Sequence, residues 1–231
     1  MDEGNAAMFM SWKSTRGRST ARMSESTTGA WDAGVSAQQN RYRYGAPIGL
    51  AVGTQVATNR GWCAVENLCP GDMVLTFDAG LQPITELRRS VLDDAHNIGA
   101  RTDWPLWVPA GALGNEAEFT LMPHQTVMVE SDLAEEYSGD PFALIPASAL
   151  EGRLGIARRA PQMEQEVITL HFEQEQVVFV NGSALVLCPA ALGGDMTRSG
   201  SYEVLDILQA QAIVQDLEPR PAERPAPQAV H

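Results

Sequence analysis

A few side chains in this 231-residue chain could take part in chemistry. His124, in the segment MPHQ (122–125), could carry a proton near neutral pH. Asn181 precedes Gly182, and this dipeptide forms a succinimide more readily than any other. The three thiols are those of Cys63, Cys69 and Cys188. These residues offer a proton carrier, a self-cyclising amide and three potential nucleophiles.

Several familiar catalytic and binding patterns are missing from the sequence. It has no Gly-x-Ser-x-Gly elbow, no His-Glu-x-x-His zinc motif and no glycine-rich phosphate loop between a strand and a helix. Asp93, Asp94 and His96 could suggest a metal site, but VLDDAHNIG (91–99) is typical of a polar loop and lacks a second ligand cluster. We therefore expect no metal and no cofactor, and the sequence indicates no enzyme that acts on other molecules.

Composition narrows the expected partners and compartment. Asp and Glu number 29 against 16 Lys and Arg, a formal net charge of −13. Such a chain is poorly suited to nucleic acid or to an anionic membrane, because both require clustered cations. Three cysteines form no closed disulfide framework and favour idle thiols in a reducing compartment. Without a signal-peptide core or an apolar span the default expectation is cytoplasmic, with export by a route that reads no N-terminal signal left open.

Changes in amino-acid composition and apolar periodicity divide the chain into four regions. Residues 1–45 are rich in Ser, Thr, Gly and Arg and are expected to form a disordered N-terminal arm. Residues 46–190 contain short runs of β-forming residues, 191–217 contain a linker and an amphipathic helix, and 218–231 form a Pro-rich, disordered tail. The sequence predicts a mostly β domain with a C-terminal helix and disordered termini.

The β region is built from short runs separated by turn residues. Asn181-Gly182 is the strongest hairpin signal, because both residues tolerate positive φ. Two short stretches inside the region, 132–137 and 146–152, look helical. The predicted strands are residues 54–58, 72–78, 84–92, 105–111, 118–122, 126–131, 166–172 and 177–181.

The segment SYEVLDILQAQAIVQDL (201–217) has helical periodicity. Ser201 could cap its start. Its apolar face is expected to consist of Val204, Leu205, Leu208, Ala212 and Ile213. Because one amphipathic helix is unstable alone, it should pack on the β domain or on another subunit. A protein partner, or self-association through helix 201–217, is therefore expected.

We interpret two further features as parts of the fold and not as functional sites. His171 alternates with Ile168, Leu170 and Phe172, so its side chain is expected to face the more polar side of its strand. Trp104 and Trp107 are expected to pack in the core.

A cluster of positions between 49 and 76 forms a specific pattern. It comprises Gly53-Thr54, Val56, Thr58, Gly61, Val65-Glu66, Leu68, Pro70-Gly71-Asp72, Val74 and Thr76. The pattern resembles the Hint domain, the fold shared by inteins and the autoprocessing domain of Hedgehog proteins, and most closely bacterial Hint-domain proteins of alphaproteobacterial type. FTLMPHQTVMVES (119–131) and the strand pair around VFVNGSALVL (178–187) extend the resemblance over about residues 46–190. It implies a Hint-like β horseshoe.

The resemblance also implies a self-cleaving N–S acyl shift. In the family, the first residue, usually Cys, attacks the carbonyl of the preceding peptide bond. A histidine in the middle motif then helps the scissile nitrogen to leave. In splicing members, a terminal His-Asn pair cyclises to release the second flank.

This sequence departs from the family at each of these positions. Gly49 stands at the nucleophile position and has no side chain to attack with. Gln125 stands at the general-acid position and cannot deliver a proton at neutral pH. His124 is adjacent, but neighbouring residues on a strand point to opposite faces. Val180 precedes Asn181 where a histidine would be expected.

Three functions remain open. The leading hypothesis is a catalytically degenerate Hint-domain protein that acts as a binding or structural module. The second is self-cleavage near Ile48-Gly49 by an atypical route that uses His124, Cys63 or Cys69. The third is a component of a larger assembly, such as a phage-like particle or a secretion apparatus, attached through the arm and the tail.

Overall fold

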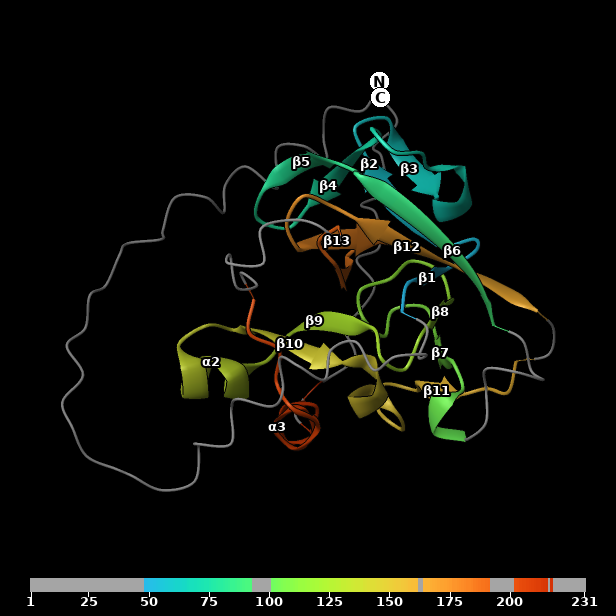
Figure 1. The fold of residues 1–231 in the computed structure, drawn as a ribbon. Coiled ribbons are helices and arrows are strands. Elements are labelled where there is room, and N and C mark those ends of the chain that lie inside the picture. Colours follow the sequence, from blue (N-terminus) through green and yellow to red (C-terminus); the bar gives the residue numbers. More distant parts are fainter. Residues whose placement is uncertain (1–47, 93–100, 162–163, 192–201, 216, 218–231) are drawn as a thin grey trace, which may run out of the picture. The chain divides into compact units, whose positions relative to one another are not determined.

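The described residues form two antiparallel sheets that share one main apolar core (Figure 1). The computed structural model describes residues 48–92, 101–161, 164–191, 202–215 and 217, all within the compact unit Val35–His231. The predicted N-terminal arm, the 93–96 loop and the Pro-rich tail lie outside the described residues. No helix in the described part is long and apolar enough to cross a membrane.

The first sheet holds the strand that begins near Gly49. Its order is β11-β7-β8-β1-β12-β6. The bounds are β1 (Leu50–Ala51), β6 (Glu86–Leu92), β7 (Leu106–Val108), β8 (Phe119–Leu121), β11 (Ala157–Arg158) and β12 (Gln165–His171). The two-residue strand β1 lies between β8 and β12, with Leu50 paired to both Leu121 and Ile168.

The second sheet contains the closing hairpin. Its order is β10-β9-β14-β13-β2-β4-β5, and β3 pairs with β2. The bounds are β2 (Gln55–Thr58), β3 (Gly61–Ala64), β4 (Met73–Thr76), β5 (Gly80–Pro83), β9 (Thr126–Glu130), β10 (Phe142–Pro146), β13 (Gln176–Val180) and β14 (Ala184–Cys188). All five residues of β13 are buried, in accordance with its unbroken apolar run Val177–Val180.

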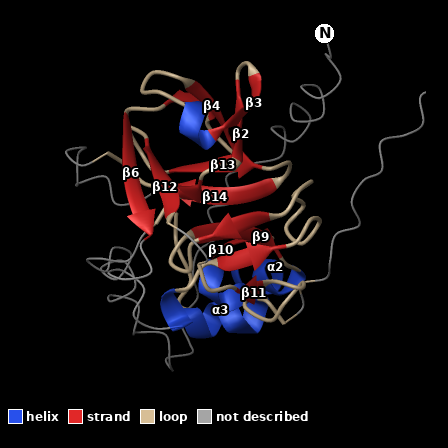
Figure 2. Cartoon of the chain, turned by 90° about the vertical axis from the view of Figure 1, so that its right-hand side faces the viewer, coloured by secondary structure: helices blue, strands red, loops and turns tan. Residues whose placement is uncertain are grey.

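Among the described residues, helical structure is limited. Helices α2 (Asp132–Ser138) and α3 (Ile207–Ile213) lie at the end of the molecule that holds β9 and β10, as Figure 2 shows. The short 3-10 turns are η2 (Val65–Asn67), η3 (Arg101–Asp103) and η4 (Ala147–Leu150). The mostly β prediction is confirmed, and so are the helix at 132–137 and all eight predicted strands, with shifted ends. The stretch 146–152 forms only the single turn η4.

The predicted C-terminal helix is confirmed but is shorter than 201–217. Val204 forms a parallel bridge with Leu144, and the Leu205 N–H donates to the Leu144 carbonyl, so this part of the segment is extended. The helix starts only after Asp206, whose side chain accepts hydrogen bonds from the N–H groups of Leu208 and Gln209 in a capping box. The backbone pairing with β10 thus replaces the first turns that periodicity predicted. Ser201 lies outside the described residues.

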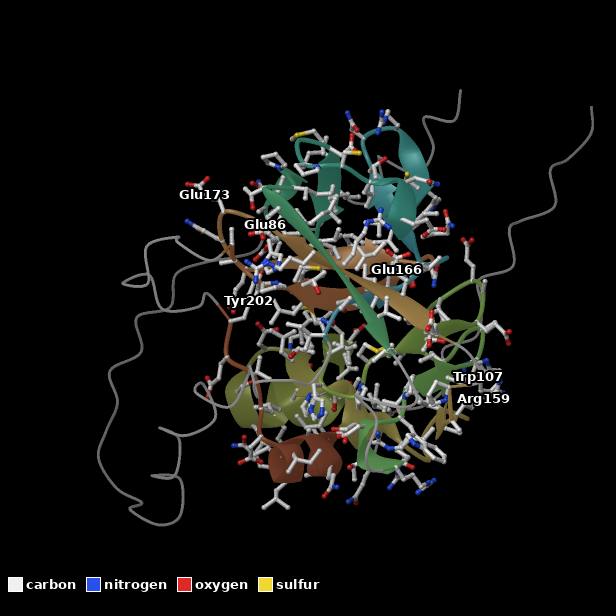
Figure 3. All side chains as sticks on the ribbon, turned by 45° about the vertical axis from the view of Figure 1, so that its right-hand side comes forward. Glu86, Trp107, Arg159, Glu166, Glu173 and Tyr202 are labelled. Carbon is white, nitrogen blue, oxygen red and sulfur yellow. The ribbon has the colours of Figure 1, made fainter. Side chains whose placement is uncertain are left out.

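Two side-chain predictions are wrong. His171 is only 6% exposed, because β12 is covered on both faces as well as paired with β1 and β6. Its Nδ1 atom lies 3.2 Å from the Ala190 carbonyl oxygen, and its Nε2 atom has no partner among the described residues. Trp104 and Trp107 are only partly buried. The Arg159 guanidinium stacks 3.7 Å from the Trp107 ring centroid, as Figure 3 illustrates.

The closing hairpin is confirmed, with a structural use of Asn181 that its position alone did not reveal. Asn181 and Gly182 have φ of 47° and 112°, as the turn requires. Val180 pairs with Ala184, so the loop has three residues. The Asn181 Oδ1 atom accepts a 2.8 Å hydrogen bond from the Gln55 N–H and ties the loop to β2.

Asn181→Ala should lower the free energy of unfolding by about 2–3 kcal/mol, because it leaves the Gln55 N–H without its acceptor and replaces asparagine by a residue that tolerates positive φ less well. Asn181→Asp keeps an acceptor oxygen and a side chain that tolerates this φ, so it should be milder. Urea denaturation of both variants provides the comparison. Equal losses would contradict the assigned role of the side-chain oxygen.

Candidate functional site

The Ile48–Gly49 peptide bond lies where three segments meet. Pairing of Leu50 with Ile168 brings the start of β1 beside Thr169 of β12. Pairing of Leu50 with Leu121 places the same end beside the turn that follows β8. The MPHQ segment (122–125) forms this turn, in which the Gln125 N–H donates to the Met122 carbonyl at 3.0 Å. The sequence-predicted positions Gly49 and Gln125 are therefore brought into direct contact.

Gln125 holds the nitrogen of this peptide bond. The Gly49 N–H donates to Gln125 Oε1 at 2.8 Å, and this hydrogen bond is buried. Gln125 itself is only 4% exposed. A carboxamide oxygen can accept a hydrogen bond but has no proton to give at neutral pH. The side chain therefore stabilises the intact amide and offers no proton to its nitrogen.

The orientation of the Gln125 amide is fixed by its other contacts. Its Nε2 atom donates to the Leu187 carbonyl at 2.6 Å, and a second carbonyl, that of Thr126, lies 3.4 Å away. Rotating the amide by 180° would place Nε2 against the Gly49 N–H and Oε1 against the Leu187 carbonyl. Both hydrogen bonds would be replaced by repulsive contacts, so Oε1 must face Gly49.

Thr169 holds the other side of the peptide bond. Its hydroxyl donates to the Ile48 carbonyl at 2.7 Å, and the residue is buried at 8% exposure. A donor at this carbonyl could stabilise negative charge that develops during attack. Thr169 was not among the residues singled out from the sequence, because a threonine within the apolar run EVITLHF (166–172) carries no signal of its own.

The backbone at Gly49 leaves no room for a side chain. Gly49 has φ of 135°, a conformation that L side chains rarely adopt. A β-carbon there would lie 2.8 Å from the Ile168 carbonyl oxygen, 2.9 Å from Thr169 Oγ1 and 2.9 Å from a Val167 methyl group. Strand β12 thus occupies the place where a nucleophilic side chain would extend.

His124 lies in the same turn as Gln125 and lines a pocket together with Ile48. Its imidazole is about a third exposed, and Nε2 lies 3.8 Å from Asp103 Oδ1 of η3. His124, Gln125 and Ile48 help to line a small pocket of about 30 Å³. Its other lining residues are Thr126, Glu175, Leu187 and Pro189. A space of this size could hold about one water molecule. The pocket supplies no contact between His124 and the Gly49 nitrogen.

The three cysteines are not placed as nucleophiles. All are free thiols, and none lines the pocket beside Ile48. Cys188 lies between two pocket residues in sequence, but it is buried, and burial raises the pKa of its thiol from 9.0 to about 12. A thiol with this pKa is almost entirely protonated at neutral pH and is a poor nucleophile. Cys63 belongs to β3, and Cys69 is exposed.

The Asn181 end of the domain also has a structural arrangement. Its side chain accepts from Gln55, and its carbonyl accepts from the Glu116 N–H at 2.6 Å, so both oxygens are engaged within the sheet. No group of three or more His, Cys, Asp or Glu side chains in the described part of the chain could hold a metal ion. The described geometry centres on one feature, an internal peptide bond held on both sides.

The chain is similar to several inteins and to an intein-like domain of known structure. No curated protein matches the sequence. A splice-inactive variant of the AceL NrdHF class 3 split intein is 15% identical, covers 63% of this chain and 100% of its own, and has a TM-score of 0.43. The bacterial intein-like domain from Clostridium thermocellum is 15% identical, covers 62% of this chain and 99% of its own, and has a TM-score of 0.44. The gp41-1 intein is 14% identical, covers 61% of this chain and 97% of its own, and has a TM-score of 0.38.

The family model for the Hint domain matches residues 48–185. This match is more than half of the 231-residue chain. It begins at Ile48, the residue whose carbonyl Thr169 contacts, and contains Gly49, His124, Gln125 and Asn181. The chain belongs to the Hint domain family.

Proposed function

We propose that this Hint domain does not cleave the Ile48–Gly49 bond and acts as a binding or structural module. The observation that carries the proposal is the buried 2.8 Å hydrogen bond from the Gly49 N–H to Gln125 Oε1. Cleavage requires the amide nitrogen to gain a proton as it leaves. At this nitrogen the protein instead places an acceptor, whose own donor group is committed to the Leu187 carbonyl.

The nucleophile is absent as well as the acid. Gly49 has no side chain, and a β-carbon at this position would meet the Ile168 carbonyl oxygen at 2.8 Å. A substituted side chain would therefore have to displace backbone atoms before it could attack. Loss of the reactive group and loss of the space for it support a site that no longer carries out an acyl shift.

The hydrogen bond to Gln125 favours the intact peptide bond. Thr169 donates to the carbonyl oxygen of Ile48, and Gln125 accepts from the nitrogen of Gly49. Both contacts are made in the ground state. An interaction accelerates a reaction only when it becomes stronger in the transition state, and the Gln125 contact would weaken as the nitrogen gained a lone pair. The Gln125 contact therefore supports a role in fixing the chain.

The alternative function, self-cleavage by an atypical route, has one observation in its favour. His124 and Ile48 line the same small pocket, so a water molecule there could be activated by the imidazole. This route still lacks a proton donor for the Gly49 nitrogen. Cys63 and Cys69 gain no support, because neither lines the pocket.

Fewer apolar residues of the C-terminal helix are free to bind a partner than the sequence predicted. Ala210, Ile213 and Val214 are already buried against the domain. Self-association through α3 would therefore use Ile207 and Leu208, which remain exposed. The function as part of a larger assembly was predicted from residues 1–45 and 218–231, which lie outside the described residues.

The proposed function is tested by intact-mass analysis of the full chain, incubated with and without hydroxylamine. We expect a single full-length species under both conditions, because no ester or thioester forms at Gly49. Loss of the mass of residues 1–48 would contradict the proposal. If such cleavage occurred and His124→Ala abolished it, the water-mediated route would be supported instead.

Gly49→Ala should lower the free energy of unfolding by about 3 kcal/mol or more, because it combines positive φ with contacts below 3.0 Å. Gly53→Ala is the matched control: φ is 91° there, but nothing lies within 4 Å of the added carbon. We expect this control to lose only about 1–2 kcal/mol, the cost of the backbone conformation. Equal losses in urea denaturation would show that the site has room for a side chain.

Gln125→Glu should make stability depend on pH. The protonated acid can accept from the Gly49 N–H and donate to the Leu187 carbonyl, as Gln125 does. The carboxylate cannot donate and is buried, so the folded state should raise the pKa of this group above its unfolded value. Stability relative to the parent protein should then be greatest at acidic pH and fall as pH rises through the folded pKa. Denaturation at several values between pH 4 and 8 measures this; a pH-independent difference would contradict the assigned contacts.

A further inference from the structure

Helix α3 lies outside residues 48–185, which the Hint family model matches, yet it is packed into the domain core. Ala210, Ile213 and Val214 are buried, and α3 contacts η4 and β10 (Figure 1). The preceding residues are also attached to the domain. The Leu205 N–H donates to the Leu144 carbonyl of β10 at 2.9 Å. The segment 202–214 therefore packs on the η4 side of the β domain and stabilises that side.

The turn η4, on which α3 packs, is hydrogen-bonded to the backbone of the MPHQ segment. The Ala147 N–H donates to the Gln125 carbonyl at 2.8 Å, and the Ser148 N–H donates to the Pro123 carbonyl at 3.0 Å. Both donors precede Ala149 and Leu150, which are buried in the same core as α3. A shift of η4 would thus move the two carbonyl groups that flank His124.

The last contact in this series is the one between Gln125 and Gly49. The Gln125 side chain has little freedom, because its amide already bonds to Gly49 on one side and Leu187 on the other. A hydrogen bond of 2.8 Å weakens steeply when its donor and acceptor separate or tilt. The position of the Gln125 backbone therefore decides whether its side chain can reach both partners.

We propose that docking of α3 on η4 holds the Pro123–Gln125 turn in place, and thereby keeps the Gly49 N–H bonded to Gln125. Undocking of α3 would loosen η4, displace the turn and open the contact at the Ile48–Gly49 peptide. The proposal deepens the proposed function, because it assigns a regulatory element to the same closed peptide bond. A contiguous set of contacts motivates this coupling, and only a measured effect at Gly49 establishes it.

Amide hydrogen exchange in the full-length, ¹⁵N-labelled protein provides that measurement. Ile213→Ala removes buried α3 side-chain atoms that pack against the core, and Ile213→Val is a milder version that keeps most of the packing. Leu208→Ala is the matched control, because Leu208 lies on the same helix but is 73% exposed. Exchange of the Gly49 amide measures opening of its hydrogen bond to Gln125, and exchange of the Ala147 amide measures opening of η4. Exchange of the Val178 amide in β13 measures opening of the whole domain.

We expect Ile213→Ala to accelerate exchange at Gly49 and Ala147 by about tenfold or more relative to Val178, with a smaller effect of the same kind in Ile213→Val. Leu208→Ala should leave Gly49 within about twofold of the parent protein. In a Gln125→Ala background, Ile213→Ala should add no further acceleration at Gly49, because the contact is already absent.

The coupling is overturned if Gly49 exchange does not change in the Ile213 variants, or changes only in parallel with Val178. Should Ile213→Ala fail to fold, the Ile213→Val variant decides the question in the same way. Intact mass of the same samples separates this result from the proposed function. Cleaved chains would count against the inert peptide bond, whereas unchanged Gly49 exchange in uncleaved chains would count against the role of α3 alone.

Discussion

The hydrogen bond between the Gly49 amide and the Gln125 side chain connects residues that are 76 positions apart in the sequence. Both groups are buried, so neither can exchange its partner for water. Leaving a buried amide N–H without an acceptor costs about 1–3 kcal/mol. The same glutamine donates to Leu187 in β14, and the entry strand β1 is thereby tied to the closing hairpin. This side chain and the Thr169 hydroxyl together hold the Ile48–Gly49 peptide bond.

This interaction also supports the proposal that the Ile48–Gly49 peptide bond is held and not cleaved. In the family that the sequence resembles, the residue at the Gln125 position supplies a proton to the scissile nitrogen. Gln125 stands at the corresponding position of this chain, where it accepts a hydrogen bond from that nitrogen and has no proton to supply at neutral pH. Gly49 then permits the close approach of β12, because the space of a side chain is occupied by Ile168 and Thr169.

The parts of the fold that depend on local sequence were predictable. The apolar run of β13 and the Asn181-Gly182 turn correctly indicated the closing hairpin, because period and turn chemistry act over a few residues. Helix α3 was predicted too long, since the bridge between Val204 and Leu144 is a tertiary contact that overrides helical periodicity. The polar orientation expected for His171 failed for a similar reason, because alternation does not reveal that both faces of β12 are covered.

The candidate site was predictable in identity but not in geometry. Gly49 and Gln125 could be singled out from the spacing of the surrounding motif, and the structure places them in contact. Thr169 could not, because its role arises from the register between β1 and β12, which no local pattern reports. The orientation of the Gln125 amide likewise follows only from its distance to the Leu187 carbonyl.

The most direct test of the account is an NMR measurement of scalar coupling across the hydrogen bond, from the Gly49 amide nitrogen to the side-chain carbonyl carbon of Gln125. Such a coupling is observed only when an N–H donates directly to that carbonyl group. We expect a resolved cross-peak between these two nuclei in the uncleaved protein, and its loss in Gln125→Ala. Absence of the cross-peak in the parent protein, with well-resolved couplings across the backbone hydrogen bonds of β13 and β14, would contradict the claim that Gln125 clamps this peptide bond.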